Sequence, residues 1–374
     1  TEMARYVLFI SLPLFIILLY KNHRIKIFTQ NETKYLNSIF IIGLFSGVPH
    51  LATYNLYFMS RDILYFVQAP MFILLGMLLY VDIKNLKRIL KLIILSSLVV
   101  TIYKLSALIL NPSIIFQLGI DTRFSFDVSN TSALLCFVIL YHSRIYSYKL
   151  FSTKYEMIFL LVSFFSITLS FSRSIYILFA IAMSVPYLNR VKLLSKAYIA
   201  SIFIVLFVVF GGLLINTEYN AVDNVTLITK FQHTFDEIII HNYTSLEEIN
   251  NNWRGFEGSL GLAKFYGSNL FELFFGQGFG AVIHTPYWIF SGNKEGLDII
   301  PMFHNGYITI LLKAGILGLF LFFVFLYKLL YLSRKYVNHG GDKVINLMVS
   351  LLQISVFIIV FRTLVIHGIF STTP

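Results

Sequence analysis

The chain of 374 residues is 57% hydrophobic and 13% charged, and its formal net charge is +11. Soluble globular domains contain about 45–50% apolar and about 25% charged residues, so this composition excludes an ordinary soluble domain and predicts a polytopic membrane protein. A net positive charge also occurs in nucleic-acid-binding proteins. Here, however, the basic residues fall mostly in short segments between apolar runs, which is typical of membrane topology, and no nucleic-acid partner is predicted.

Apolar runs of about 17–25 residues are long enough to cross a bilayer as helices. The sequence contains about ten such runs, and about 10–12 spans are compatible with it. In chain order they cover residues 5–20, 35–57, 63–82, 88–110, 128–143, 155–171, 174–189, 197–215, 305–330 and 344–366. The predicted fold class is therefore an all-α polytopic membrane protein. Residues 1–215 and 304–374 would hold the spans, and residues 216–303 would form one long loop between them.

The lysines and arginines predict the orientation of these spans. Most of the 29 basic residues lie in the segments 21–34, 83–91, 142–154, 189–196 and 328–343. Because basic loops are retained on the cytoplasmic side, the long polar loop is predicted to face outward. Arg61, Arg123, Arg173 and Arg254 lie on that same outward side.

The long loop contains its own local patterns. Val225–Glu237 and Trp253–Tyr266 have the mixed apolar and polar spacing of helices that lie along a membrane surface. The segments Gly276–Gly280 and Ser291–Asn293 are predicted turns. Outside the loop, the spacing Gly43-x-x-x-Gly47 indicates close packing of one helix against another.

Two arginines stand beside predicted spans on the outward side. Arg173 lies in a tight turn, where a charge near membrane depth has either a functional partner or a side chain that reaches the interface; position alone favours neither. Arg123 precedes the span that begins at residue 128. On position alone a local ion pair with Asp121 or Asp127 is the better interpretation for Arg123.

Two further candidates lie at the ends of the loop's last part. Arg254 opens the second loop helix, where a pair with Glu257 three residues later is the simplest interpretation. His304 precedes the span 305–330, where most histidines are interface residues, but histidine is also the natural proton acceptor at neutral pH. Asn305 is suited to cap the helix that follows.

The common side of these residues changes their interpretation. Guanidinium groups bind diphosphates through forked, charge-assisted hydrogen bonds. Arginines at the depth of a polyprenyl diphosphate, with one histidine to activate a hydroxyl group, would make a site that needs no metal. The sequence contains no Cys/His cluster for zinc and no carboxylate spacing typical of a metal loop, and no metal or other cofactor is predicted.

Four segments together resemble the bacterial superfamily of Wzy-type O-antigen polymerases and O-antigen ligases. Arg123-Phe124 with Asp127-Val128-Ser129-Asn130 is similar to the family's arginine segment before a helix, and Ser172-Arg173-Ser174 to its turn between two helices. Trp253-Arg254 with Gly276–Gly280 resembles its arginine helix and glycine-rich turn. His304-Asn305-Gly306-Tyr307, followed by Gly315–Gly318, resembles the histidine-led helix after the loop.

The resemblance implies a bundle like that of the C-type membrane glycosyltransferases, with one long periplasmic loop, in the bacterial inner membrane. It implies metal-independent, inverting transfer of a growing glycan from undecaprenyl diphosphate to a lipid-linked repeat unit. By matching position, Arg173 and Arg254 would contact the diphosphate, and His304 would be the base; Arg123, Asn130, Asn305 and Tyr307 would contact substrate. The implied partners are the undecaprenyl-diphosphate-linked oligosaccharide donor and acceptor, membrane lipids and a separate chain-length regulator.

Two other functions remain open at this point. An O-antigen ligase or an O-oligosaccharyltransferase would share the chemistry and transfer the glycan to lipid A-core or to protein. The Ile/Phe/Asn/Lys-rich composition, which resembles that of products of variable polysaccharide gene clusters, favours the polymerase. A lipid-glycan flippase or another transporter is a lesser alternative, for which Lys104, Lys313 and Arg362 inside spans are candidate midplane charges.

Overall fold

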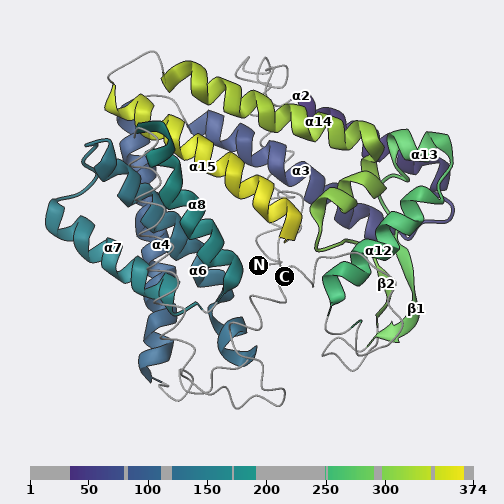
Figure 1. The fold of residues 1–374 in the computed structure, drawn as a ribbon, viewed down its shortest axis with the longest axis horizontal. Helices are drawn as coiled ribbons and strands as arrows, with labels where there is room; N and C mark the ends of the chain where they lie inside the picture. The colour runs from purple at the N-terminus through teal and green to yellow at the C-terminus, as the bar shows by residue number, and fades with distance from the viewer. Residues whose placement is uncertain are drawn as a thin grey trace. The chain divides into compact units, whose positions relative to one another are not determined.

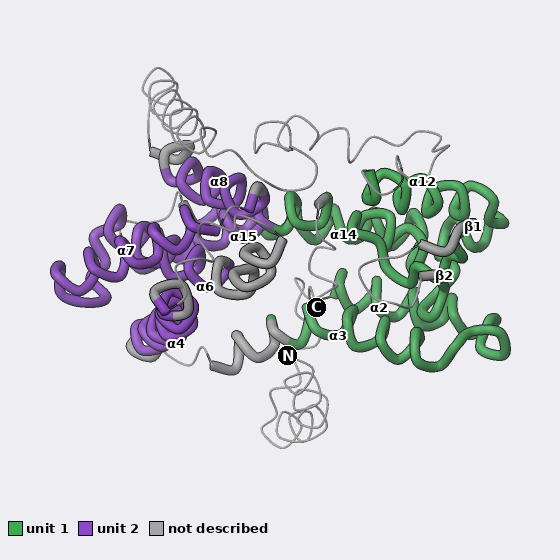
Figure 2. The backbone as a smooth tube through the Cα atoms, turned by 90° about the horizontal axis from the view of Figure 1, so that it is seen from below, with its two compact units in different colours: residues 1–79, 236–329, 359–374 green, residues 80–235, 330–358 purple. Residues whose placement is uncertain are grey.

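The computed structural model describes residues 34–79, 83–110, 120–170, 172–190, 249, 252–289, 297–337 and 342–365. The chain divides into two compact units, each assembled from segments that are far apart in sequence (Figure 2). Unit 1 contains residues 1–79, 236–329 and 359–374. Unit 2 contains residues 80–235 and 330–358.

The described part of unit 2 is helical. It contains α4 (Ile83–Leu110), α6 (Ile120–Ile145), α7 (Thr153–Thr168), α8 (Arg173–Arg190) and the first part of α15 (Lys343–Val365) (Figure 1). Ile94 of α4, Leu140 of α6 and Leu347 of α15 belong to its buried core. The His142 ring lies in the same interior, where Nδ1 bonds Ser350 Oγ at 2.9 Å and Nε2 bonds the Ala182 carbonyl oxygen at 3.0 Å. This single α6 side chain therefore joins α8 and α15.

Unit 1 combines helices with a small sheet. Its elements are α2 (Lys34–Gly47), the 3-10 helix η2 (Val48–His50), α3 (Leu56–Leu79), α12 (Trp253–Tyr266), α13 (Leu270–Phe275), β1 (Ile283–Ile289), β2 (Leu297–Ile300) and most of α14 (Gly306–Val337) (Figure 1). Its apolar core joins Ile283 and Ile300 of the two strands to Phe303 and to Ile308 of α14. Trp253 of α12 packs against this core, so the end of the long loop folds onto α14.

Three helices in the described ranges are long and apolar enough to cross a membrane, namely Leu86–Ser106, Gly306–Ser333 and Lys343–Leu364. Shorter apolar stretches, Thr131–Ile145 and Ser174–Pro186, lie in α6 and α8. The described chain is mostly helical, in agreement with the prediction of a helical membrane protein. The predicted spans 5–20 and 197–215 lie outside the described residues, and the total of about ten spans stays a prediction.

The predicted span 35–57 is wrong, because the chain breaks in its middle. Helix α2 ends at Gly47, and α3 begins only at Leu56. Pro49 lies inside the break, where it has no N–H group to continue the helical bonding. Asn55 Oδ1 accepts a hydrogen bond from the Tyr57 N–H at 2.9 Å and so caps the start of α3. Both signals are local, but a hydropathy window averages across them.

The all-α prediction also fails, between residues 283 and 300. Strands β1 and β2 pair antiparallel, with Ile283 opposite Ile300 and His284 opposite Ile299. The isoleucines at the paired end are buried in the unit 1 core, and β-branched residues favour such half-buried strands. The predicted turn Ser291–Asn293 lies between the strands, outside the described residues.

The second predicted loop helix is confirmed. Helix α12 runs over Trp253–Tyr266, the predicted range. Its buried residues include Gly258, Gly261 and Phe265, which are three and four positions apart, the spacing of one face of an amphipathic helix. The first predicted loop helix, Val225–Glu237, lies outside the described residues.

Candidate functional site

The predicted turn Gly276–Gly280 lies in unit 1, between α13 and β1. Gly276, Gly278 and Gly280 adopt φ values of 80°, 85° and 92°, a region that L side chains rarely enter. The turn packs against α2, where the Phe279 N–H donates to the Gly43 carbonyl oxygen at 2.9 Å. The close approach predicted for Gly43 and Gly47 is therefore real, but the described partner is this turn, not the predicted second helix.

On its other side, the turn bonds to a break in α14. Gly315 has φ 67° and ψ −169°, which interrupts the helix. The Gln277 N–H donates to the Leu312 carbonyl oxygen at 2.8 Å, and the Gly278 N–H donates to the Lys313 carbonyl oxygen at 3.2 Å. A Cβ atom on Gly315 would overlap the Phe274 carbonyl group. The break in α14 and the glycine turn therefore satisfy each other's backbone groups.

A buried ion pair fixes the end of the same turn. Lys313 Nζ lies 2.5 Å from Asp62 Oδ2, and both side chains are fully buried. Asp62 Oδ2 also accepts the Gly280 N–H at 2.8 Å, and Lys313 Nζ donates to the Ala281 carbonyl oxygen. Asp62 belongs to α3 and Lys313 to α14. One carboxylate and one ammonium group therefore hold the turn against two helices.

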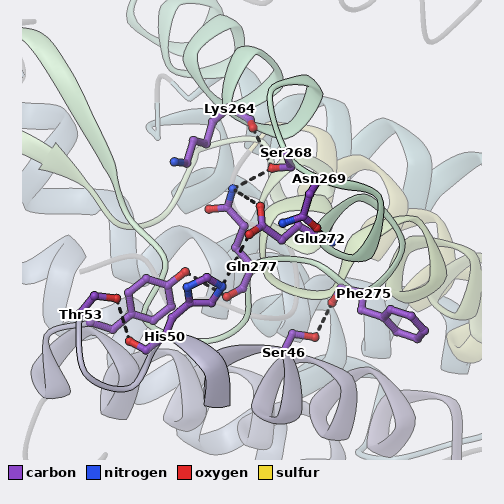
Figure 3. A network of polar contacts seen from close by, with 10 residues as sticks. Ser46, His50, Thr53, Lys264, Ser268, Asn269, Glu272, Phe275 and Gln277 are labelled. Atoms are coloured by element: carbon purple, nitrogen blue, oxygen red, sulfur yellow. Dashed lines mark hydrogen bonds and ion pairs between the residues drawn. The ribbon is translucent and has the colours of Figure 1, made fainter.

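A partly buried polar network covers the turn at Gln277 (Figure 3). Gln277 Nε2 donates to Ser268 Oγ at 2.8 Å, and the Tyr54 hydroxyl donates to the Gln277 carbonyl oxygen at 3.1 Å. Burial and the nearby negative charge of Glu272 raise the pKa of Tyr54 to about 12, so this hydroxyl stays a donor at neutral pH. His50 Nε2 lies 3.7 Å from Glu272 Oε1. Because these groups bond to one another, the network serves to anchor the turn.

Replacing Gly278 with alanine is expected to destabilise unit 1. A Cβ atom there would overlap the backbone of Gly47, at a φ of +85°, and a left-handed conformation alone costs a non-glycine residue about 1–3 kcal/mol. We expect a clearly lower melting temperature of the detergent-purified protein. Gly267→Ala is the matched control, because its nearest new contact would be 3.4 Å away at an ordinary φ of −77°. Equal melting temperatures for the two variants would contradict this account.

His304 forms a dyad with Glu257. His304 Nδ1 lies 2.7 Å from Glu257 Oε2, and the His304 N–H donates to the same oxygen at 3.0 Å. The Glu257 side chain is 5% exposed and that of His304 is 36% exposed. A buried carboxylate of α12 therefore orients an imidazole ring that is itself accessible. Since a carboxylate only accepts hydrogen bonds, Nδ1 donates, and Nε2 becomes the acceptor.

The residues that follow His304 begin α14. Asn305 Oδ1 accepts hydrogen bonds from the Tyr307 N–H at 3.0 Å and the Ile308 N–H at 3.4 Å, so the predicted cap is confirmed. The Tyr307 hydroxyl donates to the Val360 carbonyl oxygen at 3.0 Å. Asn305 and Tyr307 thus have structural bonds here, and their substrate contacts stay predictions.

Arg254 lies in the first turn of α12, three residues before Glu257, and is partly buried. Residues at this spacing are neighbours on one helix face. The predicted partner of Arg254, Glu257, bonds His304 through Oε2. The structure therefore joins His304 to Glu257, and Arg254 lies three residues before Glu257 on the same helix.

The other predicted site residues belong to unit 2. Arg173 is the first residue of α8, beside Ser172 and Ser174, whose hydroxyl oxygens lie 3.0 Å apart. Arg123 and Asn130 lie on α6, which begins at Ile120. Helix α6 therefore begins before the predicted span 128–143 and contains it. The side chains of these three site residues lie outside the described part of the structure.

Sequence reasoning missed two carboxylates that the structure makes central. Glu257 was assigned to a local pair with Arg254, and Asp62 was given no role. The only sequence signal for Asp62 is an acidic residue close to an apolar run, which is expensive in a membrane and so calls for a partner. Among the described residues, no group of three or more His, Cys, Asp or Glu side chains is arranged to hold a metal ion.

Comparisons of this chain with protein-family models, curated proteins and solved structures give no match.

Proposed function

We propose that this chain is a membrane glycosyltransferase of the O-antigen polymerase type, acting on glycans carried by undecaprenyl diphosphate at the periplasmic face of the inner membrane. The observation that carries the proposal is the 2.7 Å bond between His304 Nδ1 and Glu257 Oε2 at the start of an apolar helix. An oriented, accessible imidazole is a suitable general base at neutral pH. The resemblance of four sequence segments supplies the substrate class.

The dyad has a direct role in the proposed reaction. His304 Nε2 takes the proton of an acceptor sugar hydroxyl while that oxygen forms a bond to the anomeric carbon of the donor. The bond from this carbon to the diphosphate oxygen breaks, and undecaprenyl diphosphate leaves with the electron pair. Glu257 holds the ring orientation and stabilises the imidazolium ion that forms. Attack opposite the leaving group inverts the anomeric carbon.

The arginines have the complementary role in this proposal. A leaving diphosphate gains negative charge in the transition state, and forked guanidinium groups stabilise such charge. Arg254 lies three residues before Glu257 on α12, a spacing typical of one helix face, which supports its proposed role beside the dyad. The diphosphate contacts of Arg173 and Arg123 rest on the sequence resemblance alone.

Gel analysis of lipopolysaccharide after deletion of the gene tests the function itself. If the protein is a polymerase, its loss leaves one repeat unit on the lipid A-core and abolishes the ladder of longer chains. Complete loss of O-antigen from the core, with polymer kept on the lipid carrier, would assign the ligase instead. An unchanged ladder would refute both.

The buried Lys313–Asp62 pair is the observation that favours a transporter, since transporters place charges inside spans. In this structure, however, the pair bonds the Gly280 N–H and the Ala281 carbonyl oxygen. These bonds give it a structural role in holding the glycine turn, and the polymerase proposal is retained.

Arg254→Ala and Arg173→Ala are each expected to abolish the ladder while the protein still inserts into the membrane. The reason is the loss of a cation that offsets charge on the leaving diphosphate, an effect of about 100- to 1,000-fold in rate for one lost transition-state donor. Arg88→Ala, at an exposed position of α4, is the control and should give a normal ladder. Normal ladders from both site variants would refute the diphosphate assignment.

A further inference from the structure

Arg61 of α3 carries a buried cationic edge that no described residue bonds. Its Nε and Nη2 atoms are both buried, and neither has a hydrogen-bond partner within the described ranges. The contacts recorded for its guanidinium group are with aromatic rings, 5.1 Å from the Phe58 centroid and 5.9 Å from the Tyr57 centroid. Aromatic faces stabilise a cation but do not satisfy its N–H groups. A buried guanidinium edge without acceptors is costly, so an anionic ligand that supplies two acceptor oxygens would stabilise it.

The neighbouring charges do not supply that ligand. Asp62 uses its Oδ2 atom for Lys313 Nζ and the Gly280 N–H. Its Oδ1 atom is buried without a partner in the described residues. Asp62 is therefore engaged by Lys313, and an anionic ligand would balance the charge of Arg61.

The geometry of the unsatisfied atoms narrows the class of anion. Nε and Nη2 form one edge of the planar guanidinium group, the fork that binds two oxygens of a phosphate or carboxylate side by side. The chain has the composition of a membrane protein, and the abundant anions of a membrane are lipid phosphates. The Tyr57 ring, which lies against the guanidinium group, is 66% exposed. It can therefore move aside without disturbing a packed core.

We infer that Arg61 forms a phosphoryl-binding site for a membrane lipid, with the rings of Tyr57 and Phe58 as its cover. Lipid binding at Arg61 goes beyond the proposed glycosyl transfer. Any lipid with a phosphate monoester or an acidic headgroup has the oxygens that the guanidinium edge would bind. Assignment of the ligand to the polyprenyl carrier, by contrast, rests on the proposed function.

Binding of lipids to the full-length protein in detergent tests the site, with native mass spectrometry and melting temperature as the two readouts. The probes are undecaprenyl phosphate, phosphatidylglycerol and, as the zwitterionic control, phosphatidylcholine. We expect Arg61→Gln to weaken binding of the anionic lipid that the site prefers, undecaprenyl phosphate or phosphatidylglycerol, at least about tenfold. This is the size expected for a lost hydrogen bond to a charged group. Arg61→Lys, which keeps the charge but lacks the fork, should fall between Arg61→Gln and the unmodified protein.

The melting temperature without added lipid separates this site from a structural arginine. If the Arg61 charge is uncompensated without a bound anion, Arg61→Gln removes a buried, unpaired charge. The melting temperature of this variant should then equal or exceed that of the unmodified protein. Its lipid-induced rise should be lost, whereas Arg88→Gln, at an exposed position of α4, should keep it. A lower melting temperature with unchanged lipid binding would overturn the inference, as would equal binding of phosphatidylcholine.

The two lipid sources give different results in cells. If Arg61→Gln loses lipid binding and cells that carry this variant lose the ladder, the site is assigned to the lipid carrier. Lost binding with a normal ladder assigns it to an acidic phospholipid. Failure of the inference appears as unchanged binding by Arg61→Gln, while failure of the proposed function appears as a normal ladder after gene deletion, so the two failures are distinguishable.

Discussion

His304→Ala is expected to lower the rate of glycan transfer by about 100- to 10,000-fold, the usual contribution of a general base. The reason is that His304 is the accessible member of a dyad whose other member, Glu257, is buried. The measurement is extension of a lipid-linked repeat unit by the purified protein in detergent. His284→Ala is the control, because His284 is an exposed histidine of β1 in the same unit. Equal rates for both variants would leave His304 with a structural role alone.

Glu257→Gln tests whether the His304 ring must be held by a carboxylate, because the variant keeps the ring and changes only its partner. An amide is close in shape to the carboxylate and can still accept the His304 N–H bond. It can also donate to Nδ1, which would turn Nε2 into a donor and remove the base. We therefore expect a loss of rate similar to that of His304→Ala, with an unchanged melting temperature and a changed pH profile. Full activity with an unchanged pH profile would show that Glu257 does not position the base.

Lys313→Met is expected to destabilise the protein by about 3–5 kcal/mol, because it leaves the Asp62 carboxylate buried without its cation. Unfolding in detergent, followed by circular dichroism, measures this loss. Asp62→Asn should be damaging for the converse reason, since the Lys313 ammonium would then be buried without its carboxylate.

The double variant Asp62→Asn/Lys313→Met isolates the coupling between the two groups. It buries neither charge of the pair, and the amide can still accept the Gly280 N–H. Replacement of a whole buried pair by uncharged groups is often close to neutral, so we expect most of the stability to return. If the double variant loses the sum of the single losses, the pair is not the source of the effect. Transfer activity should return with stability, whereas loss of activity in a stable double variant would favour a direct role in transport or catalysis.

The features predicted well from sequence depend on neighbouring residues. The bounds of α12 follow from a repeat of apolar positions within one helix. The cap at Asn305 needs only the backbone two and three residues later. The glycine-rich turn was predicted because glycine is the residue type that tolerates its positive φ values.

The errors have equally specific causes. The break between α2 and α3 was missed because hydropathy is averaged over a window, although Pro49 and Asn55 mark it locally. The hairpin was missed because β1 gains its stability from pairing with β2 and from the shared core, and neither is visible in a single strand. A helical expectation for a membrane chain reinforced both errors.

The sequence by itself determined that this is a largely helical, apolar chain and that a histidine and a capping asparagine precede α14. It also determined where the glycines of the turn Gly276–Gly280 lie. Those properties follow from composition and from contacts within a few residues. Only the tertiary structure decided that His304 meets Glu257, 47 residues away, and that Lys313 meets Asp62, 251 residues away. Charged side chains have many candidate partners along a chain. The packing of distant elements selects one of them, because burial penalises every charge left without a partner.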